Sequence, residues 1–90
     1  SFKLKPAYPN PFNPSTTIEY SLPEAAQVSL VVYDALGRNV QELVSTMQPA
    51  GVYQITWNST DAGQNLSSGA YFIRLQAGSF NSVQRVLLVK

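Results

Sequence analysis

The stretch VYQITWN, residues 52–58, decides the fold class of this chain. Its side chains Tyr53, Ile55 and Trp57 alternate strictly with the polar Gln54 and Thr56. A β-strand places alternate side chains on opposite faces, so these three point the same way. An aliphatic side chain between two aromatic ones is typical of a packed core. The stretch therefore predicts a strand with one buried face.

The same alternation recurs on both sides of this stretch. Residues 16–22 predict a half-buried strand, and residues 27–34 (QVSLVVYD) predict a strand that is covered at least partly on both faces. In residues 39–45, Val40 and Leu43 lie three apart, which predicts a strand carrying a bulge. Two further strands are expected at residues 70–77 and 82–89.

With a short strand in the opening segment, the count is about seven strands at the ~8–12-residue spacing of all-β proteins. Each strand must bury one face, and a single open sheet would leave the aromatic residues in water. Ninety residues suit one domain. We therefore expect an all-β protein, an immunoglobulin-like antiparallel β-sandwich.

Composition excludes several classes of function. Charged residues make up 12% of the chain and its net charge is +1, whereas soluble domains average ~25% charged residues. The six basic residues are spread along the chain, which disfavours nucleic-acid binding. No apolar run is long enough for a membrane-spanning segment, and the chain does not begin with the basic-then-apolar pattern of a signal peptide. If the protein is exported, we expect its export signal upstream of Ser1.

The absence of histidine and cysteine bears on catalysis and metal binding. It excludes thiolate and imidazole zinc sites and the Cys-His and Ser-His-Asp arrangements of nucleophilic enzymes. We expect no enzymatic activity, no cofactor and no metal site. The polar loop after residue 58 offers Asn58, Asp61 and Asn65 as oxygen ligands for calcium, but a single carboxylate favours a solvated loop.

Two short motifs are interpreted first as turns. In DALGR, Asp34 is placed to cap a tight turn before Arg38, and Gly37 can adopt a positive φ there. Gly69 is expected to let the strand containing Tyr71 begin close to the sheet. The alternative of a sugar-stacking platform is weaker than core packing for its four aromatic residues, Tyr53, Trp57, Tyr71 and Phe72.

The order of five motifs carries a resemblance. YPNPFNPST, VYDALGR, AGVYQITW, SSGAYFIRL and the final VLLVK follow one another along nearly the whole chain. This order resembles the carboxy-terminal sorting domain of the type IX (Por) secretion system, type A. The immunoglobulin-like domain of the flagellar hook-capping protein is related.

The resemblance implies a function. Residues 1–7 would be a linker from an upstream cargo, and residues 8–90 the sorting domain. The domain would direct that cargo through the periplasm and across the outer membrane to the cell surface or medium. Its partners would be the outer-membrane translocon and a sortase-like peptidase that can cleave the domain and attach the cargo to a surface anchor.

The resemblance also implies positions. The PNP motif maps onto Pro9, Asn10 and Pro11, the Asp-x-x-Gly-Arg turn onto Asp34, Gly37 and Arg38, and the Gly-x-Tyr motif onto Gly69 and Tyr71. The terminal basic strand maps onto Arg85, Val86, Leu87, Leu88, Val89 and Lys90. On this resemblance, the PNP motif and the terminal strand would be the sites of translocon recognition.

Both ends also have structural interpretations. The proline run is expected to be extended, and prolines also protect an edge against further strands. Val86 and Leu88 should face the core, and the terminal strand either completes a sheet or offers unpaired backbone groups for strand addition. The alternative function is a carbohydrate- or protein-binding β-sandwich module of a multidomain secreted enzyme.

Overall fold

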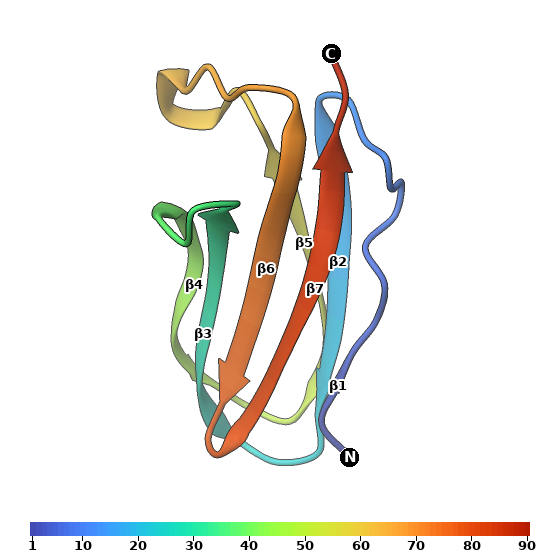
Figure 1. Cartoon of the computed structure of the whole chain (residues 1–90). Helices are drawn as coiled ribbons and strands as arrows, with labels where there is room; N and C mark the ends of the chain where they lie inside the picture. Colours follow the sequence, from blue (N-terminus) through green and yellow to red (C-terminus); the bar gives the residue numbers. More distant parts are fainter.

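The computed structural model describes the backbone of residues 1–90 and every side chain except that of Ala62. Seven β-strands and one short 3-10 helix follow one another along the chain (Figure 1). Their bounds are β1 Lys3–Leu4, β2 Ser15–Leu22, β3 Ala26–Asp34, β4 Asn39–Gln48, β5 Gly51–Asn58, η1 Asp61–Gly63, β6 Gly69–Ala77 and β7 Phe80–Leu88. The predicted all-β class is confirmed.

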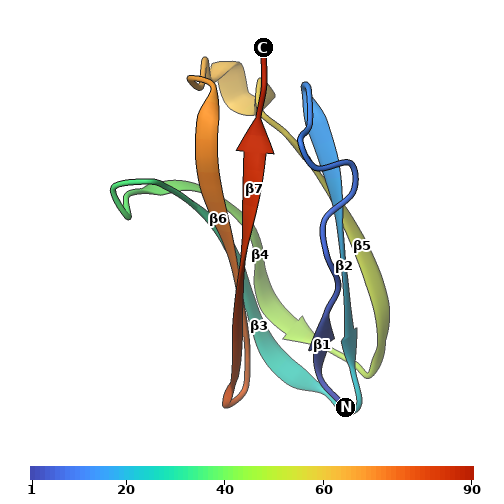
Figure 2. The ribbon, with the colours of Figure 1, turned by 45° about the vertical axis from the view of Figure 1, so that its right-hand side comes forward.

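The strands form two sheets that face one another. One sheet has the order β1-β2-β5 and the other the order β4-β3-β6-β7, with every neighbouring pair antiparallel. Figure 2, seen from the side of β7, shows the two layers apart, with the opening segment running along the β1 and β2 side. This arrangement is the predicted immunoglobulin-like sandwich.

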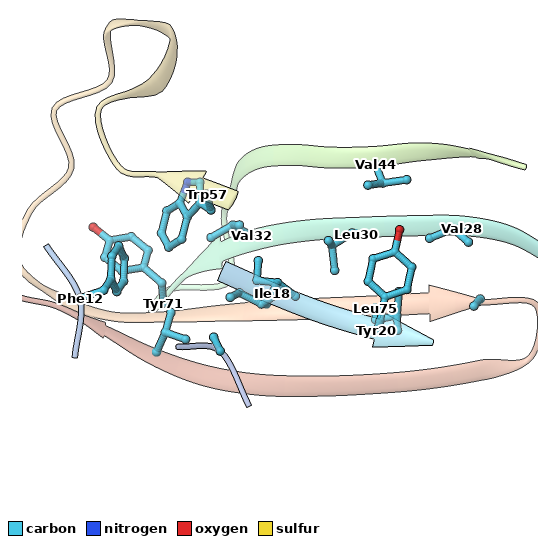
Figure 3. Close-up of a cluster of buried hydrophobic side chains, with 14 of the residues drawn as sticks. Phe12, Ile18, Tyr20, Val28, Leu30, Val32, Val44, Trp57, Tyr71 and Leu75 are labelled. Atoms are coloured by element: carbon cyan, nitrogen blue, oxygen red, sulfur yellow. The ribbon is translucent and has the colours of Figure 1, made fainter. Parts of the chain in front are cut away.

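Alternate side chains of both sheets fill the space between the layers (Figure 3). Trp57 is fully buried, and its ring centroid lies 5.1 Å from that of Phe12 and 5.6 Å from that of Tyr71. Tyr53 is half-buried and stacks on Tyr20 at 5.3 Å between centroids. The prediction of core packing is therefore confirmed for these aromatic residues.

Phe72 is the exception among the four aromatic residues considered for a stacking platform. Its neighbours in β6, Tyr71 and Ile73, are buried in the core, so Phe72 points to the opposite face of the sheet. It is half-buried there beside Tyr33 of β3, its partner in the register. The assignment of Phe72 to the core is therefore wrong.

The bulge predicted in residues 39–45 is present. The register between β3 and β4 shifts twice, between Leu30 and Val31 and between Val32 and Tyr33 of β3. An extra residue in one strand interrupts the two-residue period. This is why Val40 and Leu43, three residues apart, both pack against the core.

The opening proline run departs from the expected extended path. It bends at residues 9–11 and 13–14, and the peptide bonds before Pro9, Pro11 and Pro14 are cis. An isolated bridge joins Tyr8, before the first bend, to Thr17 of β2, and a second joins Phe12, between the bends, to Leu88 of β7. The run thus crosses from one sheet to the other, a path that alternation and proline content do not specify.

Residues 1–7 take part in the fold. Lys3 and Leu4 of β1 pair with Ser21 and Tyr20 of β2, and the Phe2 ring stacks on Phe80 at 5.5 Å between centroids. Ala7 is buried. The role of this segment as a linker from an upstream cargo stays a prediction.

Candidate recognition surface

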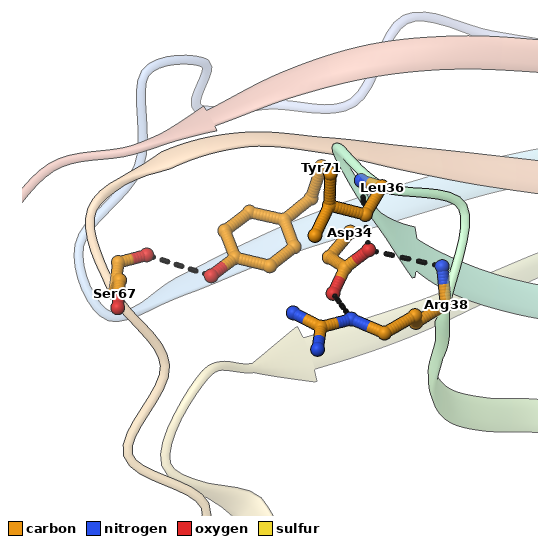
Figure 4. Close-up of polar contacts among 5 residues, drawn as sticks. All are labelled: Asp34, Leu36, Arg38, Ser67 and Tyr71. Carbon is orange, nitrogen blue, oxygen red and sulfur yellow. Dashed lines mark hydrogen bonds and ion pairs between the residues drawn. The ribbon is translucent and has the colours of Figure 1, made fainter.

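The DALGR turn is held by one carboxylate (Figure 4). Oδ1 of Asp34 accepts hydrogen bonds from the backbone N–H groups of Leu36 and Arg38, both at 2.9 Å, and Oδ2 accepts from Nε of Arg38 at 2.7 Å. Gly37 has a φ of 81°, which a glycine adopts without steric cost. The Arg38 backbone N–H, and then its guanidinium, hold the pKa of Asp34 below its ordinary value.

The start of β6 lies across a small cavity from this turn. Gly69 begins the strand with a φ of 146°, and the hydroxyl of Tyr71 donates to the carbonyl of Ser67 at 2.7 Å. Burial raises the pKa of the Tyr71 hydroxyl. A cavity of about 230 Å³ separates the two motifs and is lined by Asp34, Arg38, Ser67, Ser68 and Tyr71.

A larger groove of about 390 Å³ lies on the outer face of the four-stranded sheet. Tyr33 and Phe72 form its aromatic floor, and the rest of its lining is Arg74, Val83 and the turn residues Asp34, Ala35 and Gly37. Nε of Arg74 donates to Oδ1 of Asn81 at 3.1 Å. The groove thus combines aromatic faces with a cation, on a face that the core does not use.

The opening segment and the last strand meet at a third place. Asn10 Nδ2 donates to the carbonyl of Arg85 at 3.1 Å, and Oδ1 of the same side chain accepts from the N–H of Leu87 at 3.0 Å. Phe12 adds two backbone hydrogen bonds. Its N–H donates to the Leu87 carbonyl at 2.8 Å, and its carbonyl accepts from the N–H of Val89 at 3.0 Å. We call residues 9–12 and 85–89 the β7 junction.

The β7 junction corrects one expectation about the terminal strand. Backbone groups of Arg85, Leu87 and Val89 on its outer edge are already bonded to the opening segment. The expectation that this edge offers unpaired groups for strand addition is therefore wrong. As expected, Val86 and Leu88 are buried in the core.

A sequence profile of the FlgD Ig-like domain matches residues 13–80. The chain belongs to the FlgD Ig-like domain family. The match spans β2 to the first residue of β7, and so includes the Asp34 turn and the start of β6. This match confirms the predicted relationship to the immunoglobulin-like domain of the hook-capping protein. The assignment to the type A sorting domains stays a prediction.

A solved structure shares the fold of this FlgD Ig-like domain. It is PorZ of Porphyromonas gingivalis, described as an essential bacterial surface component of the type-IX secretion system. The two chains are 19% identical with a TM-score of 0.65, and the similarity covers 100% of this chain and 12% of that chain. No curated protein matches the sequence. At this identity the similarity establishes the shared fold.

The predicted positions of this FlgD Ig-like domain fall into two groups. Asn10 contacts Arg85 and Leu87 at the β7 junction, whereas Asp34 and Arg38 line the small cavity together with Gly69 and Tyr71. Gly37 belongs to the same turn, where its N–H donates to the Asp34 carbonyl. Between the groups, the Phe12, Trp57 and Tyr71 rings are in contact. The sequence analysis missed Tyr33 and Arg74 of the groove, although Tyr33 alternates with core residues of its strand.

Two of the three candidate calcium ligands in the polar loop accept hydrogen bonds from other groups of the protein. Oδ1 of Asn58 accepts from the N–H and the hydroxyl of Thr60, and Oδ1 of Asn65 accepts from Nζ of Lys90. Over the residues that the structure describes, no three acidic, histidine or cysteine side chains gather into a metal-binding cluster. The same described residues include no helix of the length and apolar character needed to span a membrane.

Proposed function

We propose that this FlgD Ig-like domain is a sorting domain that directs an exported cargo across the outer membrane by the type IX secretion system. The β7 junction is the observation that carries the proposal. There the Asn10 side chain bonds to both Arg85 and Leu87, so motif residues 75 and 77 positions apart form one surface. The translocon would recognise this folded surface.

The motif order fits the proposal because its members meet in the core. Phe12 comes from the opening motif, Trp57 from AGVYQITW and Tyr71 from SSGAYFIRL. The Trp57 ring contacts the Phe12 ring on one side and the Tyr71 ring on the other. The surfaces at the β7 junction and at the Asp34 turn therefore depend on the same packing. The occurrence of this fold in PorZ, a surface component of that secretion system, supports the same assignment.

The proposed role is that of a transported address and needs no catalysis. The partners are the outer-membrane translocon and a sortase-like peptidase, with the cargo in the same polypeptide. The location follows as the cell surface or the medium, with passage through the periplasm. Asn10 and the exposed residues of β7 would contact the translocon, and the buried Val86 and Leu88 would hold that strand in place.

A transplant tests the sorting role. Residues 1–90 are fused to the carboxy terminus of a fluorescent cargo with its own signal peptide, in a bacterium that has a type IX system. We expect fluorescence on the surface or in the medium, and none there when the system is disabled. Cargo retained in the periplasm with a folded domain, in a host that exports a native sorting domain, would contradict the proposal.

A matched pair of variants tests the β7 junction itself. Asn10→Ala removes the two side-chain bonds to β7, whereas Asn13→Ala changes the same residue type within the same proline run. We expect export to fall for the first variant and to persist for the second, with circular dichroism showing both folded. Equal export of the two would mean that the translocon does not recognise this surface.

The groove supports a second candidate function, a carbohydrate- or protein-binding module. Its floor of Tyr33 and Phe72 beside Arg74 offers ring faces and a cation to a ligand. Of the four aromatic residues first considered for this role, Trp57 and Tyr71 are buried, Tyr53 stacks on Tyr20, and Phe72 lines the groove. A glycan array with the intact domain and with Phe72→Ala tests this function, and retention that is absent or independent of Phe72 counts against it for glycans.

A further inference from the structure

The four edges of the two sheets are protected to different extents. At β7 the outer edge is bonded to residues 10–12 from Arg85 onward, and β1 has only two residues, one of which is Lys3, and is followed by Lys5. At β4 the register shifts twice, and Nε2 of Gln64 donates to the Val40 carbonyl at 2.7 Å. Bulges, charges and covering segments are the usual ways of protecting an edge.

The edge of β5 has none of these protections. Figure 2 shows β5 at the outer edge of its sheet, where β2 is its neighbour on the inner side. Its eight residues, GVYQITWN, include no charged residue and no proline, and all eight pair with β2 without a shift in register. Such a long regular edge is the type that accepts another strand.

The hydrogen-bond pattern shows which backbone groups are directed outward. The N–H of Ser59 donates to the carbonyl of Pro14 at 2.8 Å, which extends the β2–β5 ladder by one pair. Because bonded residues alternate in an antiparallel pair, Tyr53, Ile55 and Trp57 bond toward β2. The N–H and C=O groups of the alternate residues therefore point away from β2, namely those of Val52, Gln54 and Thr56.

The hydrogen bonds on the other edge of β2 lead to the same assignment of inward and outward groups on β5. Thr17 exchanges backbone bonds with Tyr8, and the Glu19 carbonyl accepts from the N–H of Lys5. Odd-numbered residues of β2 thus bond toward β1, which leaves its even-numbered residues for β5. The outward groups on β5 follow from both edges independently.

We propose that β5 pairs in antiparallel orientation with β5 of a second copy of this chain, around a twofold axis at Gln54. In this register Val52 lies opposite Thr56, and Gln54 lies opposite Gln54 of the other copy. On the core-facing side, Tyr53 lies opposite Ile55 of the other copy, an aromatic and β-branched pair of the type that stabilises sheets. Both residues are only half-buried in one copy.

A second copy fits this edge because the register is self-complementary. It places no charged residue opposite another, since β5 contains none. Three strands from each copy would form one continuous sheet through the β5 edge. A twofold contact closes on itself, so association stops at the dimer.

The oligomeric state of the 1–90 chain tests the interface. Light scattering after gel filtration and sedimentation equilibrium, over a range of concentrations, are expected to show a dimer. Gln54→Lys places two ammonium groups opposite one another across the axis and is expected to give a monomer. Val83→Lys is the matched control, because Val83 is also an exposed strand residue, and it is expected to leave the dimer intact.

Charge reversal tests the register. Gln54→Glu alone is also expected to be monomeric, and an equimolar mixture of Gln54→Lys and Gln54→Glu chains is expected to dimerise, because opposite charges then face one another. Thermal unfolding verifies that each variant is folded. An unmodified chain that stays monomeric at millimolar concentration overturns the proposal, and so does a dimer that Gln54→Lys leaves intact.

Thr56→Pro provides a second variant that adds no charge. It removes an outward N–H, whereas the bonds between β5 and β2 use the neighbouring residues. The folded variant is expected to be monomeric. A dimer that persists would show that the contact does not use the β5 backbone and would overturn the proposal.

Discussion

Trp57 illustrates at the scale of one residue what alternation determines. Its place in VYQITWN predicts a core position, and the side chain is fully buried between Phe12 and Tyr71. Alternation does not specify those partners, which lie 45 residues before and 14 residues after it. They come together because β5 and β6 belong to facing sheets, and because the opening segment that carries Phe12 bridges to β7.

Replacement of the Trp57 indole measures how much the aromatic contacts contribute to the free energy of unfolding. We expect Trp57→Ala to lower the free energy of unfolding by about 3–5 kcal/mol, since it removes a buried ring and leaves a cavity. Val52→Ala, on the exposed face of the same strand, should change it by no more than about 0.5 kcal/mol. Urea unfolding of both variants measures the difference, and a small loss for Trp57→Ala would contradict the core assignment.

Asp34 gives a pH dependence at the same scale. The Arg38 backbone N–H and guanidinium and the Leu36 N–H hold its folded pKa below the ordinary value of 3.8. Its contribution to stability is therefore present above pH 3.8 and is lost as the pH falls through the lower folded pKa. We expect Asp34→Asn to reduce the acid-dependent loss of stability in this window.

Two measurements check the Asp34 prediction. Carboxyl carbon NMR should place its titration midpoint below 3.8, and a midpoint at or above that value would contradict the assignment. Glu19→Gln serves as the comparison for unfolding at low pH. The pKa of Glu19 is lowered mainly by a hydrogen bond from Lys5, so it contributes to the pH dependence in the same direction.

At the scale of the element, β7 is both a core strand and part of the candidate recognition surface. Val86 and Leu88 are buried, while backbone groups of Leu87 bond to the opening segment. The alternation of buried and exposed residues was predicted from the sequence. The covered edge was not, because it depends on a segment at the other end of the chain.

Truncation of β7 should therefore remove the fold along with any recognition. We expect deletion of residues 86–90 to abolish cooperative unfolding, because losing Val86 and Leu88 costs a large part of the ~5–15 kcal/mol that stabilises a small domain. Deletion of Lys90 alone should leave the domain folded, since that residue is exposed. Circular dichroism during heating distinguishes the two, and a folded 1–85 chain would show that β7 is dispensable to the core.

At the scale of the whole molecule, residues 1–12 close one side of the sandwich. The segment pairs with β2, stacks Phe2 on Phe80 and bonds to β7 through Asn10 and Phe12. On the other side, β4 and β5 follow one another across Pro49 and Ala50, and β5 keeps its open edge. The two sides therefore differ in how readily another chain can add to them.

A chain that begins at residue 8 tests the predicted boundary of the domain. It lacks β1, the Phe2 ring and the buried Ala7, and we expect its free energy of unfolding to fall by about 2–3 kcal/mol. A chain that lacks only the exposed Ser1 is the control. Equal stability of the two in urea would show that residues 1–7 act as a linker alone.

The sequence by itself determined the strands, their buried faces and the bulge, because side-chain alternation is a local property of an extended backbone. It also indicated the turn at Asp34, where a carboxylate and a glycine three residues apart shape the backbone locally. Only the tertiary structure decided that Asn10 bonds to β7, that Phe72 lines an outer groove and that β5 keeps a free edge. These features depend on which distant segments become neighbours, and that is set by the packing and register of both sheets together.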